Sequence, residues 1–309
     1  MPTRRQFLHT TGAGLLALPS FLEARDDSRT FHLGVIADTH IIDEFYRGPE
    51  GNAEDTDSIF KTTDRLTAAR DRLNALSPGL EMLFLVGDCV HDYPSADLDF
   101  FYQHKTRIDH ARTLTDGFRV PVHVGLGNHD YAVPKVSREG THELFRRKLG
   151  LRPYYAVDHR GWKFIHLNNF LGTTWQAGHA DYAKGRGSLG EAQLEWLDAQ
   201  LSERKPSFIF VHYPLSAIVP AEFRDLGLHS LLKRHAATVQ RVISGHWHRW
   251  VDVGREFGPA HLVIAATRYD PDAYLIVEVD AKAGTHRLLN LDLVEWNTHF
   301  SRPYEPARR

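Results

Sequence analysis

The sequence of 309 residues predicts an α/β fold, on three observations. Short apolar runs bounded by glycine or polar residues have the length of buried strands. Between them lie stretches with apolar residues every three or four positions, as in residues 56–76, where Ile59, Leu66 and Leu73 share one helical face. Helices come early in the chain and strands cluster late, which favours an α/β core completed by a largely antiparallel second sheet.

The expected elements follow in chain order. A glycine turn at residues 159–161 joins two runs that are expected to pair as antiparallel strands, 154–158 and 163–167. The remaining strands are expected at residues 31–37, 82–86, 120–125, 208–212, 239–244, 250–253, 261–265, 273–279 and 286–291. Helices are expected at residues 56–76, 97–114, 138–149, 190–201 and 221–235.

Composition excludes several classes of protein. The net charge is −2 with both signs well mixed, so the chain lacks the basic stripe of a dedicated nucleic-acid binder. No run reaches the roughly 18 to 20 apolar residues of a stable membrane span. Cys89 is the single cysteine, which excludes an intrachain disulfide. Without an internal repeat or linker, the simplest division is one large domain over residues 30–295 and a polar tail over 296–309.

The first 25 residues predict export. Paired Arg4 and Arg5 precede Phe7 and Leu8, and a mildly apolar stretch over 12–22 then leads to a polar segment. This order resembles a twin-arginine signal, which implies passage through the twin-arginine translocation machinery to the periplasm or the medium. A disordered basic N-terminus and an uncleaved anchor are the alternatives, although the apolar stretch is short for a span.

Five apolar runs end at residue types that bind metal ions. In an open α/β sheet the loops at the carboxyl ends of the strands converge on one crevice, so these distant residues can meet there. Any one ending alone is typical of an ordinary turn or of a hydrogen-bonded strand-end histidine. The endings are Asp38-Thr39-His40, Gly87-Asp88, Gly127-Asn128-His129-Asp130, His212 and Gly245-His246-Trp247-His248.

This ordered set resembles the motifs of the calcineurin-like metallophosphoesterase family, from Phe31 to about Leu293. The resemblance implies a four-layer α-β-β-α sandwich of two mixed sheets flanked by helices. It also implies hydrolysis of a phosphoester by in-line attack of a hydroxide that bridges two metal ions.

The resemblance further implies which residues hold the ions. The first ion would be held by Asp38, His40 and His248, the second by Asn128, His212 and His246, with Asp88 bridging both. Imidazole together with carboxylate suits divalent or trivalent ions such as Mn, Fe, Zn or Co, among which the sequence does not choose. Purple acid phosphatases have a tyrosine ligand three residues after the bridging aspartate. Here that position is His91, which argues against that branch.

The expected general acid is His129, which follows the ligand candidate Asn128. Family members often orient this histidine with an acidic residue three positions after the bridging aspartate. Because His91 occupies that position, Asp92 is the expected partner. Cys89 is expected to be a small packed residue rather than a ligand.

Substrate is expected to contact Asn128 and two long loops. Tyr46 and Arg47 lie in residues 41–55, with Asn52 beyond them. Lys184 and Arg186 lie in residues 168–187, which also carry Trp175, His179 and Tyr182. Ordinary solvated loop residues are the alternative for both segments.

The expected substrate is a small phosphodiester, pyrophosphate or phosphomonoester. Residues 187–197 resemble the segment before the histidine strand in small-molecule members of the family, without distinguishing among them. A nuclease and a protein phosphatase on the same fold are alternatives, as is a non-catalytic envelope protein that the metals only stabilise.

Overall fold

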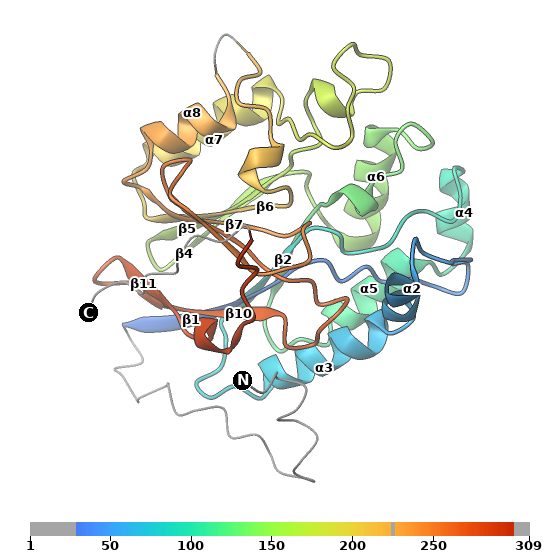
Figure 1. Cartoon of the computed structure of the whole chain (residues 1–309), viewed down its shortest axis with the longest axis horizontal. Coiled ribbons are helices and arrows are strands. Elements are labelled where there is room, and N and C mark those ends of the chain that lie inside the picture. Colours follow the sequence, from blue (N-terminus) through green and yellow to red (C-terminus); the bar gives the residue numbers. More distant parts are fainter. Residues whose placement is uncertain (1–28, 224–225, 300–309) are drawn as a thin grey trace.

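The computed structural model describes residues 29–223 and 226–299, and contains two sheets stacked face to face. The expected export signal over residues 1–25 and most of the expected tail lie outside this range. Figure 1 shows helices α2, α3 and α5 on one side of the stack and α7 and α8 on the other. In the described ranges, no helix combines the length and the apolar character that a membrane span requires.

The first sheet has five strands in the order β11-β10-β1-β2-β3. β1, β2 and β3 are parallel, whereas β10 runs antiparallel to β1 and β11 antiparallel to β10. The bounds are Thr30–Ile36 for β1, Met82–Val86 for β2, Val122–Gly125 for β3, Tyr274–Asp280 for β10 and Thr285–Leu288 for β11.

The second sheet has six strands in the order β4-β5-β6-β7-β9-β8. β5, β6, β7 and β9 are parallel neighbours, and the antiparallel partners β4 and β8 lie at the two edges. The bounds are Tyr155–His159 for β4, Trp162–Leu167 for β5, Ser207–Val211 for β6, Val239–Ser244 for β7, Val251–Gly254 for β8 and Ala260–Val263 for β9.

Seven α-helices lie in the described part of the chain. They are α2 at Ala53–Ile59, α3 at Thr62–Asn74, α4 at Leu98–Gln103, α5 at Arg107–Thr115, α6 at Arg138–Leu149, α7 at Glu191–Ser202 and α8 at Leu228–Arg234.

The side chains of β2 show why two sheets and their helices form one stack. Successive residues of a strand point to opposite faces. Leu83 and Leu85 belong to the core that includes the helices, whereas Phe84 belongs to the core between the sheets. Its ring stacks on Phe210 of β6, with centroids 4.3 Å apart and planes at 15°. Because β2 is buried on both faces, its sequence is continuously apolar rather than alternating.

The predicted fold class is confirmed: the chain is α/β, with two mixed sheets flanked by helices. The prediction of a largely antiparallel second sheet is wrong, because four of its six strands are parallel neighbours. Helices α7 and α8 connect successive strands of this sheet, and a crossover of that length returns the chain parallel. The late strands β10 and β11 pair with the first sheet instead.

Three predicted helices are shorter or interrupted. The helix expected at residues 56–76 is divided into α2 and α3, and the one expected at 97–114 into α4 and α5. A new helix begins after Thr106, whose backbone N–H donates to the Asp109 carboxylate at 2.8 Å, so a capping interaction interrupts the apolar period. The helix expected at 221–235 is reduced to α8, since the backbone N–H groups of Glu222 and Phe223 donate to the Leu226 carbonyl rather than to a preceding turn of helix.

Candidate metal centre

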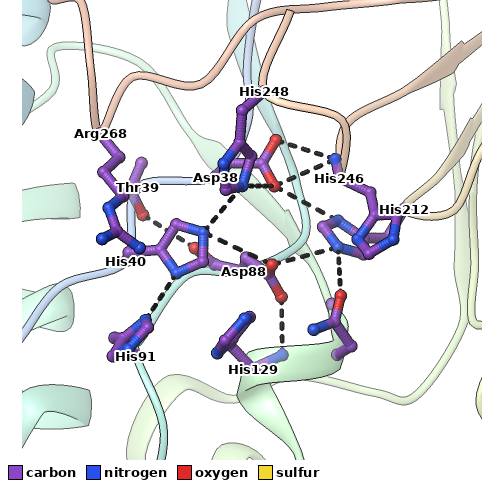
Figure 2. A network of polar contacts seen from close by, with 12 residues as sticks. Asp38, Thr39, His40, Asp88, His91, His129, His212, His246, His248 and Arg268 are labelled. Atoms are coloured by element: carbon purple, nitrogen blue, oxygen red, sulfur yellow. Dashed lines mark hydrogen bonds and ion pairs between the residues drawn. The ribbon is translucent and has the colours of Figure 1, made fainter. Parts of the chain in front are cut away.

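All seven expected metal ligands lie at one edge of the stack, beyond the carboxyl ends of five strands. Figure 2 shows six of these side chains converging from separate loops: Asp38, His40, Asp88, His212, His246 and His248. The residues follow β1 (Asp38, His40), β2 (Asp88), β3 (Asn128), β6 (His212) and β7 (His246, His248). Asp38, Asp88 and His212 are at most 1% exposed, so loops from both sheets enclose the centre.

The first group consists of Asp38, His40, Asp88 and His248, whose nearest ligand atoms all lie within 4.8 Å of one another. Nε2 of His40 is 3.2 Å from Nε2 of His248 and 3.5 Å from Oδ2 of Asp88. Nε2 of His248 is 3.4 Å from Oδ1 of Asp38. Ligands bound to one ion at about 2.1 Å, with angles of about 90–110° between them, lie about 3.0–3.4 Å apart. The donor types and their spacing therefore fit a transition-metal ion.

The second group consists of Asp88, His212 and His246, also within 4.8 Å of one another. Nε2 of His212 lies 3.2 Å from Oδ2 of Asp88 and 3.0 Å from Oδ1 of Asn128. The same oxygen of Asp88 thus faces His40 in the first group and His212 in the second. Its other oxygen accepts the backbone N–H of His129 at 2.8 Å. Asp88 belongs to both groups, as a bridging ligand requires.

The backbone at these residues is unusual. Among the described residues other than glycine, eight have a positive φ, and six of these are expected site residues. A left-handed conformation costs an ordinary residue about 1–2 kcal/mol, and such residues cluster at functional sites. The six are Asp38, His40, Asp88, Asp92, His246 and His248, with φ between 47° and 69°. The unfavourable left-handed backbone conformation therefore occurs mainly at the residues whose side chains form the candidate metal centre.

The expected acid His129 lies beside the metal-ligand candidates, and its side chain is 32% exposed. Its Nδ1 is 3.0 Å from Oδ1 of Asp92. Burial lowers the pKa of His129, but the charge of Asp88 and the hydrogen bond to Asp92 outweigh it, so the pKa is raised. The hydrogen bond from His129 in turn lowers the pKa of Asp92. The structure thus places Asp92, rather than His91, against Nδ1 of His129.

Asp130 is a site residue to which the sequence reasoning gave no role. It is fully buried, and its carboxylate accepts the backbone N–H groups of Gly127 at 2.7 Å, Val90 at 2.9 Å and Cys89 at 3.2 Å. These bonds tie the loop after β3 to the loop after β2. Burial and the nearby Asp88 raise the pKa of Asp130 to about 7. Its position directly after Gly127-Asn128-His129 was the available signal.

The two loops expected to bind substrate are placed unevenly. The Tyr46 hydroxyl donates a hydrogen bond to the Glu50 carboxylate. The centroid of the Tyr46 ring lies 5.7 Å from that of His91, a neighbour of the first group. Exposed Arg47 donates only to backbone oxygens of its own loop among the described contacts. Asn52 is the N-cap of α2, which makes it a structural residue.

In the loop over residues 168–187, Trp175 is 2% exposed, so its indole offers no stacking surface to a substrate. Lys184 lies above that indole, with Nζ 5.7 Å from the ring centroid. The Lys184 carbonyl accepts the Tyr213 hydroxyl at 2.7 Å, and the Tyr213 ring lies 4.2 Å from His246. Exposed Arg186 uses its carbonyl to accept the Trp175 indole N–H at 3.1 Å. Among the described contacts, neither Lys184 nor Arg186 places its charged group against a metal-ligand candidate.

Comparison with known families identifies the fold and the centre together. The family described as calcineurin-like phosphoesterases matches residues 31–250, well over half of the chain, and this match includes all seven ligand candidates. The chain belongs to this family. For a calcineurin-like phosphoesterase, the two buried groups of histidine and aspartate are consistent with a binuclear metal site.

Solved structures share the fold of this calcineurin-like phosphoesterase at low sequence identity. A dimetal phosphatase from Danio rerio is 18% identical, with a TM-score of 0.55 over 81% of this chain and 92% of that one. GAP50, described as the anchor in the inner membrane complex of Plasmodium, is 13% identical, with a TM-score of 0.50 over 86% and 90%. No curated protein sequence matches the chain. These likenesses support the fold and leave substrate and activity open.

Proposed function

We propose that this calcineurin-like phosphoesterase hydrolyses a small phosphodiester, pyrophosphate or phosphomonoester with two bound ions of Mn, Fe or Zn. The position of Asp88 carries the proposal. One of its oxygens lies 3.5 Å from Nε2 of His40 and 3.2 Å from Nε2 of His212, between the two ligand groups. A site for a single ion would require imidazole ligands on only one side of Asp88. Here His40 lies on one side and His212 on the other, which favours two ions.

The site residues have two proposed roles: the ligand candidates bind the ions, and His129 donates a proton. When bound by these residues, the two ions would lower the pKa of a water and would offset negative charge on phosphoryl oxygens. Asp88 is suited to lie between them because burial, which opposes its ionisation, is outweighed by His212 and His129, so its pKa is well below the usual range. Its orientation is fixed by the backbone N–H of His129.

His129 is the proposed general acid. Asp92 accepts from its Nδ1–H, which leaves Nε2 as the nitrogen that can carry a second proton toward a substrate. The charge of Asp88 and the hydrogen bond to Asp92 raise the pKa of His129, which favours its protonated form. Its partly exposed side chain can reach a leaving-group oxygen, whereas Asp38, Asp88 and His212 are buried.

Small substrates are favoured over polymeric nucleic acid by the charge of the chain. A net charge of −2 with mixed signs provides little attraction for a polyanion. The proposed contacts of Asn128, Tyr46, Arg47, Lys184 and Arg186 with substrate remain predictions.

Turnover measurements test the proposal directly. Purified protein would be assayed with bis-p-nitrophenyl phosphate, p-nitrophenyl phosphate and single-stranded DNA, each with Mn²⁺, Fe²⁺, Zn²⁺ or Co²⁺. Metal-dependent cleavage of a nitrophenyl ester, lost in Asp88→Asn and retained in the exposed control Asp116→Asn, supports it. Preferred cleavage of DNA indicates a nuclease instead. No turnover with any ion, in protein that binds two ions, overturns the catalytic proposal in favour of a structural role.

Export through the twin-arginine route is a separate proposal, supported by the sequence alone. Arg4 and Arg5 lie outside the described residues. A protein that selects its ions gains from folding before it crosses the membrane, since that route carries folded cargo. Replacing both arginines by lysine should leave the precursor inside the cell, as measured by fractionation. Unchanged export of that variant would contradict the proposal.

A further inference from the structure

His91 occupies the position where the family places an acidic or tyrosine residue, and the proposed reaction leaves it without a role. Its side chain is 3% exposed and lies between two partners. Its Nδ1 is 2.9 Å from Nδ1 of His40, and its Nε2 is 3.0 Å from Oε1 of Glu50. Figure 2 shows the first of these contacts on the side of His40 that faces away from Asp88.

The chemistry of the three groups fixes where their protons are. A carboxylate only accepts hydrogen bonds, so Nε2 of His91 carries the proton that Glu50 accepts. In the neutral imidazole, Nδ1 of His91 is then an acceptor, and Nδ1 of His40 must donate to it. This leaves the lone pair of His40 on Nε2, which faces His248 at 3.2 Å and Asp88 at 3.5 Å. A histidine ligand needs this tautomer, and its second nitrogen is commonly held by such a partner.

Glu50 is itself held by groups from distant parts of the chain. It accepts the Tyr46 hydroxyl, and its Oε2 lies 3.4 Å from Nη2 of Arg268. The Arg268 side chain is buried, donates to the Ser58 hydroxyl at 2.8 Å, and is therefore fixed in place. The backbone N–H of Arg268 donates to the carbonyl of Asp38 at 3.0 Å. The contacts thus run from one ligand candidate of the first group, through Arg268, Glu50 and His91, to another.

We propose that Glu50 and His91 form a positioning pair that fixes the tautomer and orientation of His40, and thereby sets the affinity of the first metal site. The inference rests on the proposed pair of ions. Two neighbouring residues thus orient two different histidines: Asp92 accepts a hydrogen bond from Nδ1 of His129, and His91 accepts one from Nδ1 of His40. The rings of His91 and His129 stack at 4.6 Å with planes at 18°, so His91 also supports the acid from the side.

Two substitutions of His91 separate its hydrogen bond from its bulk. His91→Phe keeps a ring to stack on His129 but removes the acceptor for His40. His91→Asn loses the ring but can present Oδ1 near the place of Nδ1. Glu50→Gln conserves shape and removes the charge that fixes the proton on His91. Glu44→Gln, an exposed substitution in the same loop, is the matched control.

The measurement is Mn²⁺ binding to metal-free protein by equilibrium dialysis with elemental analysis, which resolves tighter and weaker sites. Loss of a partner behind a ligand lowers metal affinity by about 10–100-fold. We expect His91→Phe and Glu50→Gln to weaken one of the two sites by this factor and to leave the other unchanged. His91→Asn should recover most of the affinity, and Glu44→Gln should match the wild type.

The outcomes separate this inference from the proposed function. Two ions bound with wild-type affinity in both Glu50→Gln and His91→Phe would overturn the positioning role while leaving the phosphoesterase proposal intact. Equal weakening of both sites, together with a lower melting temperature of the metal-free protein, would show general destabilisation and also overturn it. A wild-type protein that binds fewer than two ions would instead contradict the proposed function. If His91→Phe fails to fold, the Mn²⁺ affinity of Glu50→Gln, compared with that of the wild type, tests the positioning role by itself.

Discussion

A methyl group at Gly127 should displace the bridging carboxylate. A Cβ built on Gly127 would lie 2.2 Å from the backbone nitrogen of Asp88 and 2.2 Å from its Oδ1. Reaching the 3.0 Å that real contacts respect requires a shift of 3.0 − 2.2 = 0.8 Å. Rotation of the Asp88 side chain cannot provide it, because the nitrogen belongs to the main chain. Metal–ligand distances tolerate only about 0.2 Å, so Gly127→Ala should move Asp88 out of reach of at least one ion.

The expected loss in kcat/KM for bis-p-nitrophenyl phosphate is about 100-fold or more, since a misplacement near 1 Å has that effect at a catalytic site. Overpacking of this kind also costs about 1–3 kcal/mol of unfolding free energy. The control is Gly79→Ala, whose Cβ would meet only a carbonyl oxygen at 3.8 Å. Metal content would be measured by elemental analysis after dialysis, alongside activity. A Gly127→Ala protein with two ions and wild-type activity would refute the argument that this glycine makes room for Asp88.

Three further predictions concern single side chains. Asp88→Asn should lower the affinity for both ions by at least about 100-fold, because the amide lacks the negative charge that both ligand groups share. Binding of two ions with wild-type affinity by this variant, measured by equilibrium dialysis, would contradict the prediction. His129→Ala should keep both ions and slow an alkyl phosphate about 10²–10⁴-fold, with a smaller effect on p-nitrophenyl phosphate, whose leaving group needs no proton. Loss of metal from that variant would remove His129 from the role of acid. Burial lowers the pKa of His166 to about 3, below the unfolded value of 6.5, so its stabilising contribution is complete above pH 6.5 and is lost as the pH falls toward 3. Between pH 7 and pH 5 this loss is about 2 kcal/mol, and urea unfolding of metal-free His166→Gln should show a pH dependence flatter by that amount. An equal pH dependence in both proteins would contradict the assignment.

Local sequence patterns were sufficient for the fold class and for the residues gathered at the centre. Each expected ligand lies within four residues of the end of a strand, and a run such as Phe84-Leu85-Val86 ending in Gly87-Asp88 indicates both the buried strand and the turn after it. Because parallel strands bring their carboxyl ends to one edge of a sheet, the convergence of endings within one sheet was predictable without coordinates. That these endings come from two stacked sheets was shown by the structure. The assignment of each residue to a chemical role is a matter for the experiments above.

The sequence by itself therefore determined that this chain is an α/β protein with histidine and aspartate at its strand ends. Each of these features depends only on residues that are close together in the sequence. Only the tertiary structure decided that β10 joins β1, that Asp130 ties two loops together, and that Glu50 lies 3.0 Å from His91 across 41 positions. Strand order and hydrogen-bond partners depend on which distant surfaces pack together. That packing is an energetic property of the whole chain, and no local window of sequence contains it.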